Sequence, residues 1–262
     1  MNDKKLISIE PWWVKCLGLF QDGTVKVIHI EETQGLHQYS YHVISDLGWN
    51  EICDLNSSRS HVVGLTKDGR VKVYTNSYIF EDYKDWSNII QVKAGYEITI
   101  GLTADGNMLY ECNASRQSKY CDFDHVKLIA PCWNGAVGLC SDGVLFNMKE
   151  DREKVLAYDW SEVIQITATD ENVFGLSKDG YVRSLHDNMQ VQQWDSIIKI
   201  VSGNNHLLGL RKDGTVLSYG KNEYGQCNVG EWKSIRDVFA GCYHTVALNE
   251  DGDIIAPCNL WY

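Results

Sequence analysis

Hydrophobic and polar residues alternate over short stretches of the chain, and Asp-Gly pairs separate these stretches. In residues 206–217, an apolar stretch runs up to Leu210, Asp213-Gly214 follow, and a second apolar stretch begins at Val216. An Asp-Gly pair in this setting predicts a β-hairpin, because both residues tolerate the positive φ that a two-residue type I′ turn requires. The pattern therefore predicts two strands joined by a two-residue turn.

The same unit recurs along the whole chain. Asp-Gly pairs occur at Asp22-Gly23, Asp68-Gly69, Asp105-Gly106, Asp142-Gly143, Asp179-Gly180, Asp213-Gly214 and Asp251-Gly252, at intervals of 46, 37, 37, 37, 34 and 38 residues. Three residues before each aspartate stands a leucine, and four before stands a glycine, or Ala247 in the last unit. Nineteen before stands an aromatic residue in six units, namely Trp49, Trp86, Phe123, Trp160, Trp194 and Trp232; the first unit has Asp3. Seven units account for residues 1–262, which we interpret as one repeat domain.

Each unit is predicted to form a small antiparallel sheet, with a strand such as residues 89–94 directly after the aromatic. A sheet of this size cannot bury both faces alone, and the repeated glycine indicates a close neighbour on one of them. Units stacked around an axis give an all-β, seven-bladed β-propeller. We expect the two ends of the chain to share a blade and close the ring, with Trp261 near Leu6 or Ile7. The alternative is that Trp261 only packs on the surface.

The units resemble the repeat of the regulator-of-chromosome-condensation family. The last full unit carries Gly220-Lys221-Asn222-Glu223-Tyr224-Gly225-Gln226 and then Ala240-Gly241-Cys242-Tyr243-His244-Thr245-Val246-Ala247-Leu248, which are similar to that family's two conserved elements. The resemblance also implies seven blades. The first element occurs only once, and the repeat histidine is kept at His61, His206 and His244 but replaced by Lys15, Ile98, Gly135 and Asn172. The scaffold is thus retained while the loops diverge.

Charge and composition narrow the possible partners. The chain has 24 Lys and Arg against 35 Asp and Glu, a formal net charge of −11. This charge argues against a nucleic-acid surface, so we expect no binding to duplex DNA. No apolar run reaches the ~20 residues that span a membrane. The first residues do not look like a signal peptide, so the expected location is cytoplasmic.

The nine cysteines are scattered and include no Cys-x-x-Cys pair. We expect reduced thiols, without a metal or another cofactor. A metal site formed by Cys112, Cys121, Cys132 and Cys140 is the alternative, although these spacings match no common zinc pattern.

The candidate site lies in the loops between the first and second strands. These loops vary in size and charge between nearly constant flanks, and in a propeller all seven lie on one face. The candidate binding residues are Trp13, Arg59, Tyr96, Glu97, Trp133, Asn134, Asp170, Glu171, Asn204, Asn205 and Tyr243. Large aromatic residues with an arginine are typical of binding hot spots. The alternative is that the aromatics only cover the core. The insertion at residues 29–45 is either a loop that adds contacts or a surface loop without a role.

The sequence contains no catalytic motif. The repeat histidines are interpreted as scaffold residues that satisfy a nearby backbone group. Our first hypothesis is a non-enzymatic module that binds a protein partner through the aromatic loops. The secreted bacterial inhibitor of β-lactamases is similar in architecture, and that resemblance also implies binding.

Two alternatives remain. The first is a small polar or anionic molecule in the axial funnel, stacked on the aromatics and fixed by Arg59. The second is an enzyme that uses Asp170, Glu171 or Glu97 with a repeat histidine, or a guanine-nucleotide exchange factor, which only the family's fold implies. An open, polar funnel favours the small molecule, and a flat aromatic crown favours the protein partner.

Overall fold

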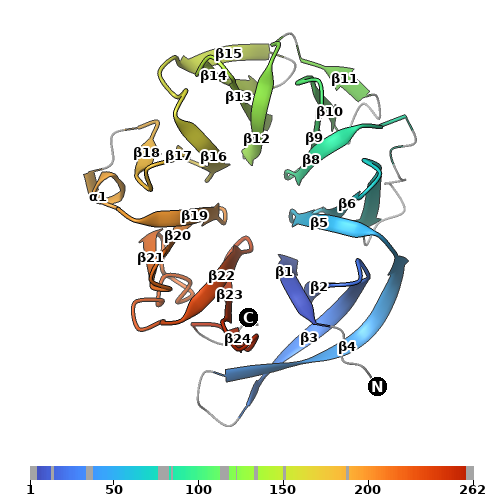
Figure 1. The fold of residues 1–262 in the computed structure, drawn as a ribbon, viewed down its shortest axis with the longest axis vertical. Coiled ribbons are helices and arrows are strands. Elements are labelled where there is room, and N and C mark those ends of the chain that lie inside the picture. Colours follow the sequence, from blue (N-terminus) through green and yellow to red (C-terminus); the bar gives the residue numbers. More distant parts are fainter. Residues whose placement is uncertain are drawn as a thin grey trace.

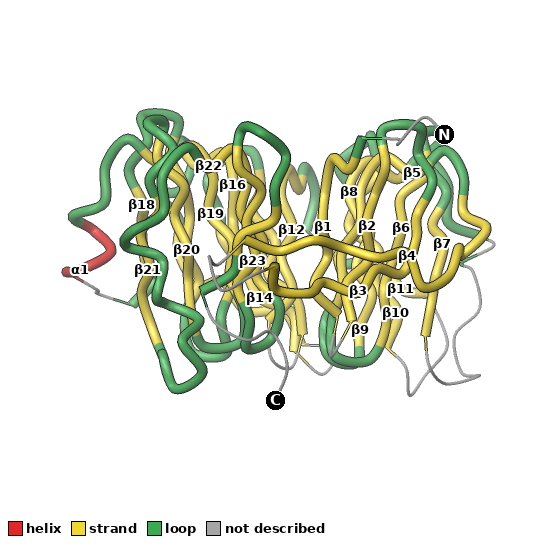
Figure 2. The backbone as a smooth tube through the Cα atoms, turned by 90° about the horizontal axis from the view of Figure 1, so that it is seen from below, coloured by secondary structure: helices red, strands yellow, loops and turns green. Residues whose placement is uncertain are grey.

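The described residues form seven antiparallel blades around a central axis (Figure 1). The computed structural model describes residues 5–12, 15–33, 38–75, 83, 85–112, 118–121, 123–132, 135–149, 152–186 and 189–257. Figure 2 shows the strands running between two faces that carry the loops. The predicted all-β propeller with seven blades is confirmed.

The blades follow one another in chain order. Blade 1 contains β1 (Leu6–Trp12), β2 (Lys15–Phe20), β3 (Val25–Thr33) and β4 (Gln38–Trp49). Blade 2 contains β5 (Ile52–Ser57), β6 (His61–Thr66) and β7 (Val71–Thr75). Blade 3 contains β8 (Ile89–Ala94), β9 (Ile98–Thr103), β10 (Met108–Cys112) and β11 (Ser118–Tyr120). Blade 4 contains β12 (Val126–Cys132), β13 (Gly135–Cys140), β14 (Leu145–Lys149) and β15 (Arg152–Ala157).

Blade 5 contains β16 (Val163–Ala168), β17 (Val173–Ser177) and β18 (Val182–Ser184). Blade 6 contains β19 (Ile197–Ser202), β20 (His206–Arg211) and β21 (Val216–Gly220). Blade 7 contains β22 (Ile235–Ala240), β23 (Thr245–Asn249) and β24 (Ile254–Ile255). Within the described ranges the helical structure is a single four-residue turn, α1 (Met189–Gln192).

The Asp-Gly turns are three-residue loops, so the prediction of two-residue type I′ turns is wrong. In the first turn, the Gly23 N–H donates to the Phe20 carbonyl at 2.8 Å, and the Phe20 N–H donates to the Thr24 carbonyl at 3.0 Å. Gly23 has a φ of 81°, whereas no aspartate among the described residues has a positive φ. This is a type I turn followed by a left-handed glycine, and the same two hydrogen bonds recur in all seven turns.

Six of these turns also dock on the next blade. The Ile89 N–H, at the start of β8, donates to the carbonyl of Gly69 at 3.1 Å. A Cβ atom on Gly69 would lie 3.0 Å from the Ile89 nitrogen. Glycine is therefore required there for its backbone conformation and for the close approach. The last turn differs, because nothing lies within 4 Å of a Cβ placed on Gly252.

The repeat aromatic packs on the repeat glycine of its own unit. A Cβ atom on Gly101 would lie 2.7 Å from Cζ3 of Trp86. Equivalent distances of 2.6–2.7 Å join Gly64 to Trp49, Gly175 to Trp160 and Gly209 to Trp194. The Trp86 ring also packs against Val63 and Leu65 of the preceding blade. The predicted close neighbour of the glycine is thus a tryptophan that fills the space between two blades.

Blades 1 and 7 are joined by the insertion at residues 29–45, which extends the β3–β4 hairpin rather than forming a loop. In β4, Tyr39 pairs with Ile254 and Gln38 pairs with Ile255 of β24. One seven-stranded sheet therefore runs from β1 through β4 to β24 and β22, and Figure 1 shows β4 passing along the outside of the ring beside β24. The two ends of the chain meet through this shared sheet.

The joint between blades 1 and 7 has its own hydrophobic core, which replaces the aromatic missing from the first unit. Phe20 packs near Tyr41 with ring centroids 6.2 Å apart, and both belong to the cluster that contains Ile254 and Phe239. A Cβ on Gly18 would meet Leu6 Cδ1 at 2.8 Å, so a leucine occupies the place of the tryptophan. The predicted position of Trp261 lies outside the described residues.

Replacing Gly69 by alanine should destabilise the fold more than the same change at Gly252. Both glycines have a positive φ, of 77° and 90°, so both variants carry a strain of about 1 kcal/mol. Only Gly69→Ala also pushes a methyl group against the Ile89 backbone, which should add about 1–2 kcal/mol. Urea unfolding measures both values. Equal losses of unfolding free energy in the two variants would show that the turn does not need the close contact between Gly69 and the Ile89 backbone.

Shortening the β3–β4 hairpin should open the joint between blades 1 and 7. Replacing residues 31–40 with an Asn-Gly turn removes Gln38 and Tyr39, the pairing partners of β24. The expected loss is about 2 kcal/mol, or about 4–8 °C in melting temperature for a chain of this size. Removing residues 258–262 is the comparison. If only that second variant melts earlier, the last residues and not the hairpin close the ring.

Candidate functional site

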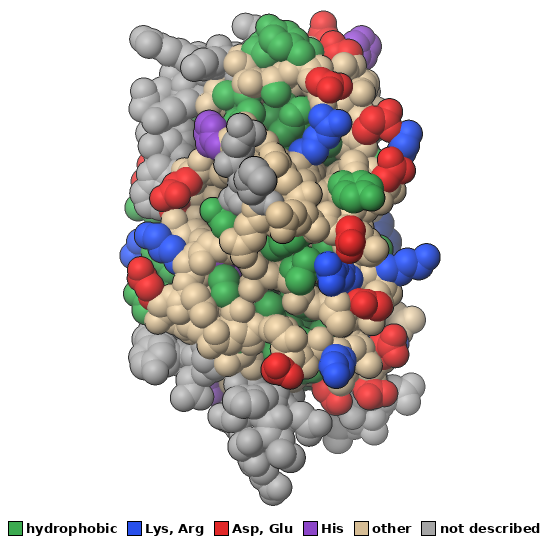
Figure 3. Space-filling model, turned by 90° about the vertical axis from the view of Figure 1, so that its left-hand side faces the viewer, with side chains coloured by type: hydrophobic (Ala, Val, Ile, Leu, Met, Phe, Trp, Pro, Cys, Tyr) green, Lys and Arg blue, Asp and Glu red, His purple; other side chains and the backbone are tan. Residues whose placement is uncertain are grey.

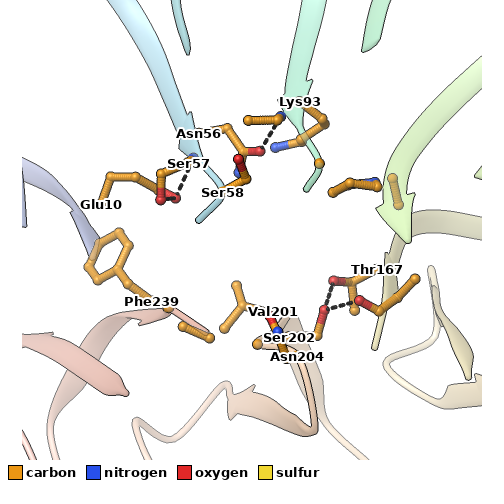
Figure 4. Close-up of a pocket in the computed structure, with 18 of the residues that line it drawn as sticks. Glu10, Asn56, Ser57, Ser58, Lys93, Thr167, Val201, Ser202, Asn204 and Phe239 are labelled. Atoms are coloured by element: carbon orange, nitrogen blue, oxygen red, sulfur yellow. Dashed lines mark hydrogen bonds between the residues drawn. The ribbon is translucent and has the colours of Figure 1, made fainter. Parts of the chain in front are cut away.

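The inner strands β1, β5, β8, β12, β16, β19 and β22 surround an axial channel with a volume of about 350 Å³. Side chains twelve and fourteen residues before each Asp of the Asp-Gly turns line its wall. The inner set is Glu10, Asn56, Lys93, Ala130, Thr167, Val201 and Phe239, and the other set includes Ser8, Asp54, Gln91, Leu128, Gln165 and Lys199. Figure 4 shows several of these side chains around the opening.

Most polar residues of the channel wall connect neighbouring blades. Asn56 Oδ1 accepts a hydrogen bond from the Ala94 N–H at 2.8 Å (Figure 4). Gln165 pairs with the backbone of Ile200, accepting from its N–H at 3.0 Å and donating to its carbonyl at 2.8 Å. Hydrogen bonds between inner strands hold the ring together along the axis, so these side chains have a structural role.

Glu10 is the most perturbed acid of the channel. Its Oε1 accepts hydrogen bonds from the Ser57 N–H at 2.8 Å and from the Ser57 hydroxyl at 2.9 Å. Burial raises the pKa of Glu10 to about 7, although Ser57 and the charge of Lys93 act in the opposite direction. Near neutral pH, Glu10 is therefore close to its pKa.

The two lysines of the channel differ in their surroundings. Lys199 forms an ion pair with Asp237, and its ammonium lies 4.8 Å from the ring centroid of Phe239. In the described part of the chain, no such ion pair or hydrogen bond involves Lys93, which lies beside Asn56 (Figure 4). Lys93 is thus the cation of the channel that is available to a ligand.

The loops that join the first and second strands of the blades form one face, here called the ab-loop face. Arg59, Tyr96, Asp170 and Asn204 line the mouth of the channel on this face. Hydrogen bonds tie the loops to one another. The Asp170 N–H donates to the Asn204 carbonyl at 2.7 Å, and the Ser60 hydroxyl donates to the Tyr96 carbonyl at 2.6 Å. The loop of blade 2 is therefore linked to that of blade 3, and the loop of blade 5 to that of blade 6.

Charges of opposite sign meet at this mouth. Burial raises the pKa of Asp170, and a hydrogen bond from Asn205 Nδ2 at 3.3 Å acts against that rise. Burial also raises the pKa of the Cys242 thiol, which the Arg59 charge lowers and the Asp170 charge raises. The mouth thus presents a cation and an anion around a partly buried thiol.

Two predicted aromatic residues of the ab-loop face are exposed. Tyr96 is 39% exposed and Tyr243 is 41% exposed. Tyr243 lies beside Tyr224, with ring centroids 5.6 Å apart, and Tyr224 is 47% exposed. Sequence reasoning missed Tyr224 as a site residue. The available signal was its place in the Gly220–Gln226 element, where its N–H donates to the buried Gln226 side chain at 2.9 Å.

The remaining predicted residues are not all in one place. Glu97 is exposed beside Tyr96, whereas Glu171 and Asn205 line a separate hollow of about 610 Å³ between blades 5 and 6. Trp13, Trp133 and Asn134 lie outside the described residues. The structure therefore brings four of the eleven predicted residues to the channel mouth and sets the other described ones around it.

The buried repeat histidines link adjacent blades. His61 Nε2 lies 2.7 Å from Thr99 Oγ1, which also accepts the Tyr83 hydroxyl at 2.7 Å. His206 Nε2 lies 3.2 Å from Thr245 Oγ1. Burial lowers the pKa of both histidines to about 4. They are scaffold residues that contact a threonine hydroxyl of the next blade, and the backbone of His244 also acts on His206.

Other described parts of the molecule show fewer features of a functional site. In the described ranges, no three His, Cys, Asp or Glu side chains gather in a way that could hold a metal ion. No helix among the described residues is long and apolar enough to span a membrane. Figure 3 shows the outer wall near β18 and β21, where acidic and basic side chains are mixed and hydrophobic ones form small areas.

The comparisons with known proteins agree with this architecture. The model of the regulator of chromosome condensation (RCC1) repeat matches residues 197–226, and no curated protein matches the chain in sequence. Human WBSCR16 is similar in structure with a TM-score of 0.73 and 16% identity, over 95% of this chain and 88% of that one.

Two further structures are similar. The ectodomain of the ACR4 receptor kinase from Arabidopsis thaliana has a TM-score of 0.64 and 14% identity, over 94% of this chain and 92% of that one. A structure of Kap60 bound to yeast RCC1 (Prp20) has a TM-score of 0.60 and 14% identity, over 78% and 69%. The chain is therefore a seven-bladed β-propeller. One stretch, residues 197–226, matches the RCC1 repeat model, in agreement with the sequence resemblance.

Glu10 and Lys93 are two of the channel-wall residues that the candidate set did not contain. Both stand twelve residues before the Asp of an Asp-Gly pair, within strands that are otherwise read as hydrophobic alternation. A polar residue at that repeat position, as also in Asn56 and Thr167, was the signal that could have found the channel wall.

The stability difference between the wild type and Glu10→Gln should depend on pH. The pKa of Glu10 is higher in the fold than its usual 4.5, so the wild type gains stability below pH 4.5 and loses it as pH rises to 7. Because water reaches the channel wall, we expect a loss of about 2 kcal/mol in the unfolding free energy of the wild type relative to Glu10→Gln. Denaturant unfolding at pH 4.5 and 7.5 measures the difference.

The buried histidines do not affect the difference in stability between the wild type and Glu10→Gln. The folded pKa of His61 and His206 lies below the usual 6.5, so both add stability as pH rises from 4 to 6.5. That contribution is the same in the wild type and in Glu10→Gln. A stability difference that stays constant between the two pH values would contradict the raised pKa of Glu10.

Proposed function

We propose that this propeller is a non-enzymatic binding module that recognises a protein partner through the ab-loop face. The observation that supports the proposal is the set of exposed tyrosines, Tyr96, Tyr243 and Tyr224, on that face. They come from different blades, and the framework tryptophans and leucines fill the core without them. Exposed tyrosines beside an arginine are a common basis of protein binding.

Hydrogen bonds between the loops of blades 5, 6 and 7 support the same function. The Asn204 N–H donates to the Cys242 carbonyl at 3.2 Å, and the Asp170 N–H donates to the Asn204 carbonyl at 2.7 Å. Three consecutive blades are therefore linked at the level of the binding surface. A surface that is already ordered loses little conformational entropy when a partner binds.

One of the similar structures is that of Kap60 bound to yeast RCC1 (Prp20), a protein that binds another protein. We take this as support for protein recognition by the present chain and not as evidence for the same partner. A shared fold does not imply a shared partner.

A second candidate function is the binding of a small polar molecule in the axial channel. The channel volume of about 350 Å³ is at the lower end of the range for ligand pockets. Lys93 is available to an anionic group, and Glu10 provides a carboxyl group close to its pKa at neutral pH. This open, polar channel is the observation that favours the second candidate.

Tyr96→Ala and Tyr243→Ala should weaken partner binding without unfolding the protein. We expect each to reduce affinity about thirtyfold, equivalent to about 2 kcal/mol, because an aromatic contact at the centre of an interface is lost. The partner is first isolated from lysate, and calorimetry then measures its affinity for each variant. Tyr120→Ala is the matched control, since Tyr120 is 67% exposed on the outer strand β11.

The outcomes separate the two candidates. Lower melting temperatures with unchanged binding would make Tyr96 and Tyr243 scaffold residues and would contradict the proposal. If native mass spectrometry finds a bound small molecule that Lys93→Gln loses, while the tyrosine variants behave as wild type, the channel is the site.

A further inference from the structure

Each inner strand contains a β-bulge near its start. In β8, the pairing register with β9 shifts between Ile89 and Gln91, so Ile90 is an extra residue. The same shift occurs at the start of the first strand in all seven blades. The extra residues are Ile7, Cys53, Ile90, Lys127, Ile164, Ile198 and Arg236. The bulge turns these side chains out of the space between the blades.

Most of these extra residues are exposed and apolar. Ile90 is 58% exposed, Ile164 57%, Ile198 55% and Ile7 40%. Together with the exposed Cys53, they form what we call the isoleucine collar, which is made of Ile7, Cys53, Ile90, Ile164 and Ile198. The collar lies outside the channel wall, on the face opposite to the ab loops. Ile89, the residue before Ile90, donates its N–H to the carbonyl of Gly69 in an Asp-Gly turn. The collar therefore lies on the face that carries these turns.

The fold itself does not require isoleucine at this position. Blades 4 and 7 carry Lys127 and Arg236 there, and both reach a neighbouring backbone. Lys127 Nζ donates to the Ser161 carbonyl at 2.8 Å, and Arg236 Nη2 donates to the Leu6 carbonyl at 3.1 Å. A charged residue at the bulge is thus accepted. Repeated exposure of a large apolar residue on one face is typical of an interaction surface.

Acidic groups surround the collar. Every Asp-Gly turn presents an exposed aspartate on this face. The turn segments 20–24, 66–70, 103–107, 140–144, 177–181, 211–215 and 249–253 contain nine Asp and Glu against five Lys and Arg. Hydrogen bonds from threonine hydroxyls lower the pKa of Asp68, Asp105 and Asp213, which keeps these carboxylates charged.

Part of the positive charge on this face is already paired. Arg211 lies 3.2 Å from Asp195, and Lys178 forms an ion pair with Glu162. The face therefore presents exposed apolar side chains beside turns that carry net negative charge. A second copy of this chain is a poor fit, because two such faces would bring like charges together.

We propose that this turn face is a second interaction surface, where the isoleucine collar and the turn aspartates bind a basic protein segment that carries apolar side chains. The apolar side chains of that segment pack between Ile90, Ile164 and Ile198, and its Lys and Arg pair with the carboxylates. The surface is independent of the ab-loop face, so one propeller can hold two partners at once.

The test uses the full chain and a defined probe. The probe is a fluorescein-labelled synthetic helical peptide with leucine on one side and lysine on the other, and fluorescence anisotropy measures its binding. We expect binding that weakens as salt is raised, because exposed charges contribute. The variant Ile90→Ser/Ile164→Ser/Ile198→Ser should lose at least about tenfold in affinity. These side chains are exposed, so the variant should remain folded, which circular dichroism checks.

Two controls define the outcomes. Val43→Ser/Ile44→Ser changes two exposed apolar residues of β4, 48% and 58% exposed, and should bind the peptide as the wild type does. A peptide with glutamate in place of lysine should not bind. No binding of the lysine peptide at about 100 µM, equal binding of both peptides, or an unchanged affinity in the triple serine variant would each overturn the proposal. Self-association that the triple variant abolishes in sedimentation would assign the collar to a second copy instead.

Discussion

The ring depends on the contact between a tryptophan and a glycine of the same repeat. In blade 3 the Trp86 ring occupies the space that a side chain on Gly101 would need, and it fills the gap to blade 2. A larger residue in place of the glycine would push the ring outward and separate the blades. Blade 4 uses a variant of the contact, in which Phe123 stacks on Phe146 with centroids 4.0 Å apart. The contact sets the distance between blades, so the loops can vary without changing the fold.

The fold was largely predictable because its signals are local and repeated. Alternation after the aromatic located strands such as β8, and the glycine indicated a close neighbour that is now seen as tryptophan. The turn type was not predictable from Asp-Gly alone, because two-residue and three-residue loops accept the same pair. The β3–β4 hairpin was missed because its partner strand β24 lies at the other end of the chain.

The candidate site was less predictable than the fold. Topology alone places the ab loops on one face, so Arg59, Tyr96, Asp170 and Asn204 were found from the repeat. The channel residues were hidden in strands that the hydrophobic pattern treats as core. The raised pKa of Glu10 comes from burial where β1 lies beside β5, the strand that carries Asp54 and Ser57. Such a property arises from packing around an axis and cannot be read from one segment.

The pairing of β4 with β24 has a consequence for synthesis of the chain. More than two hundred residues separate Tyr39 from Ile254. A ribosome that has made blades 1 to 6 has therefore released a hairpin whose outer edge still lacks its partner strand. Open strand edges are the places where chains join wrongly. The exposed, polar and charged residues His42, Ser45 and Asp46 along β4 reduce that danger while the nascent chain waits for its last strand.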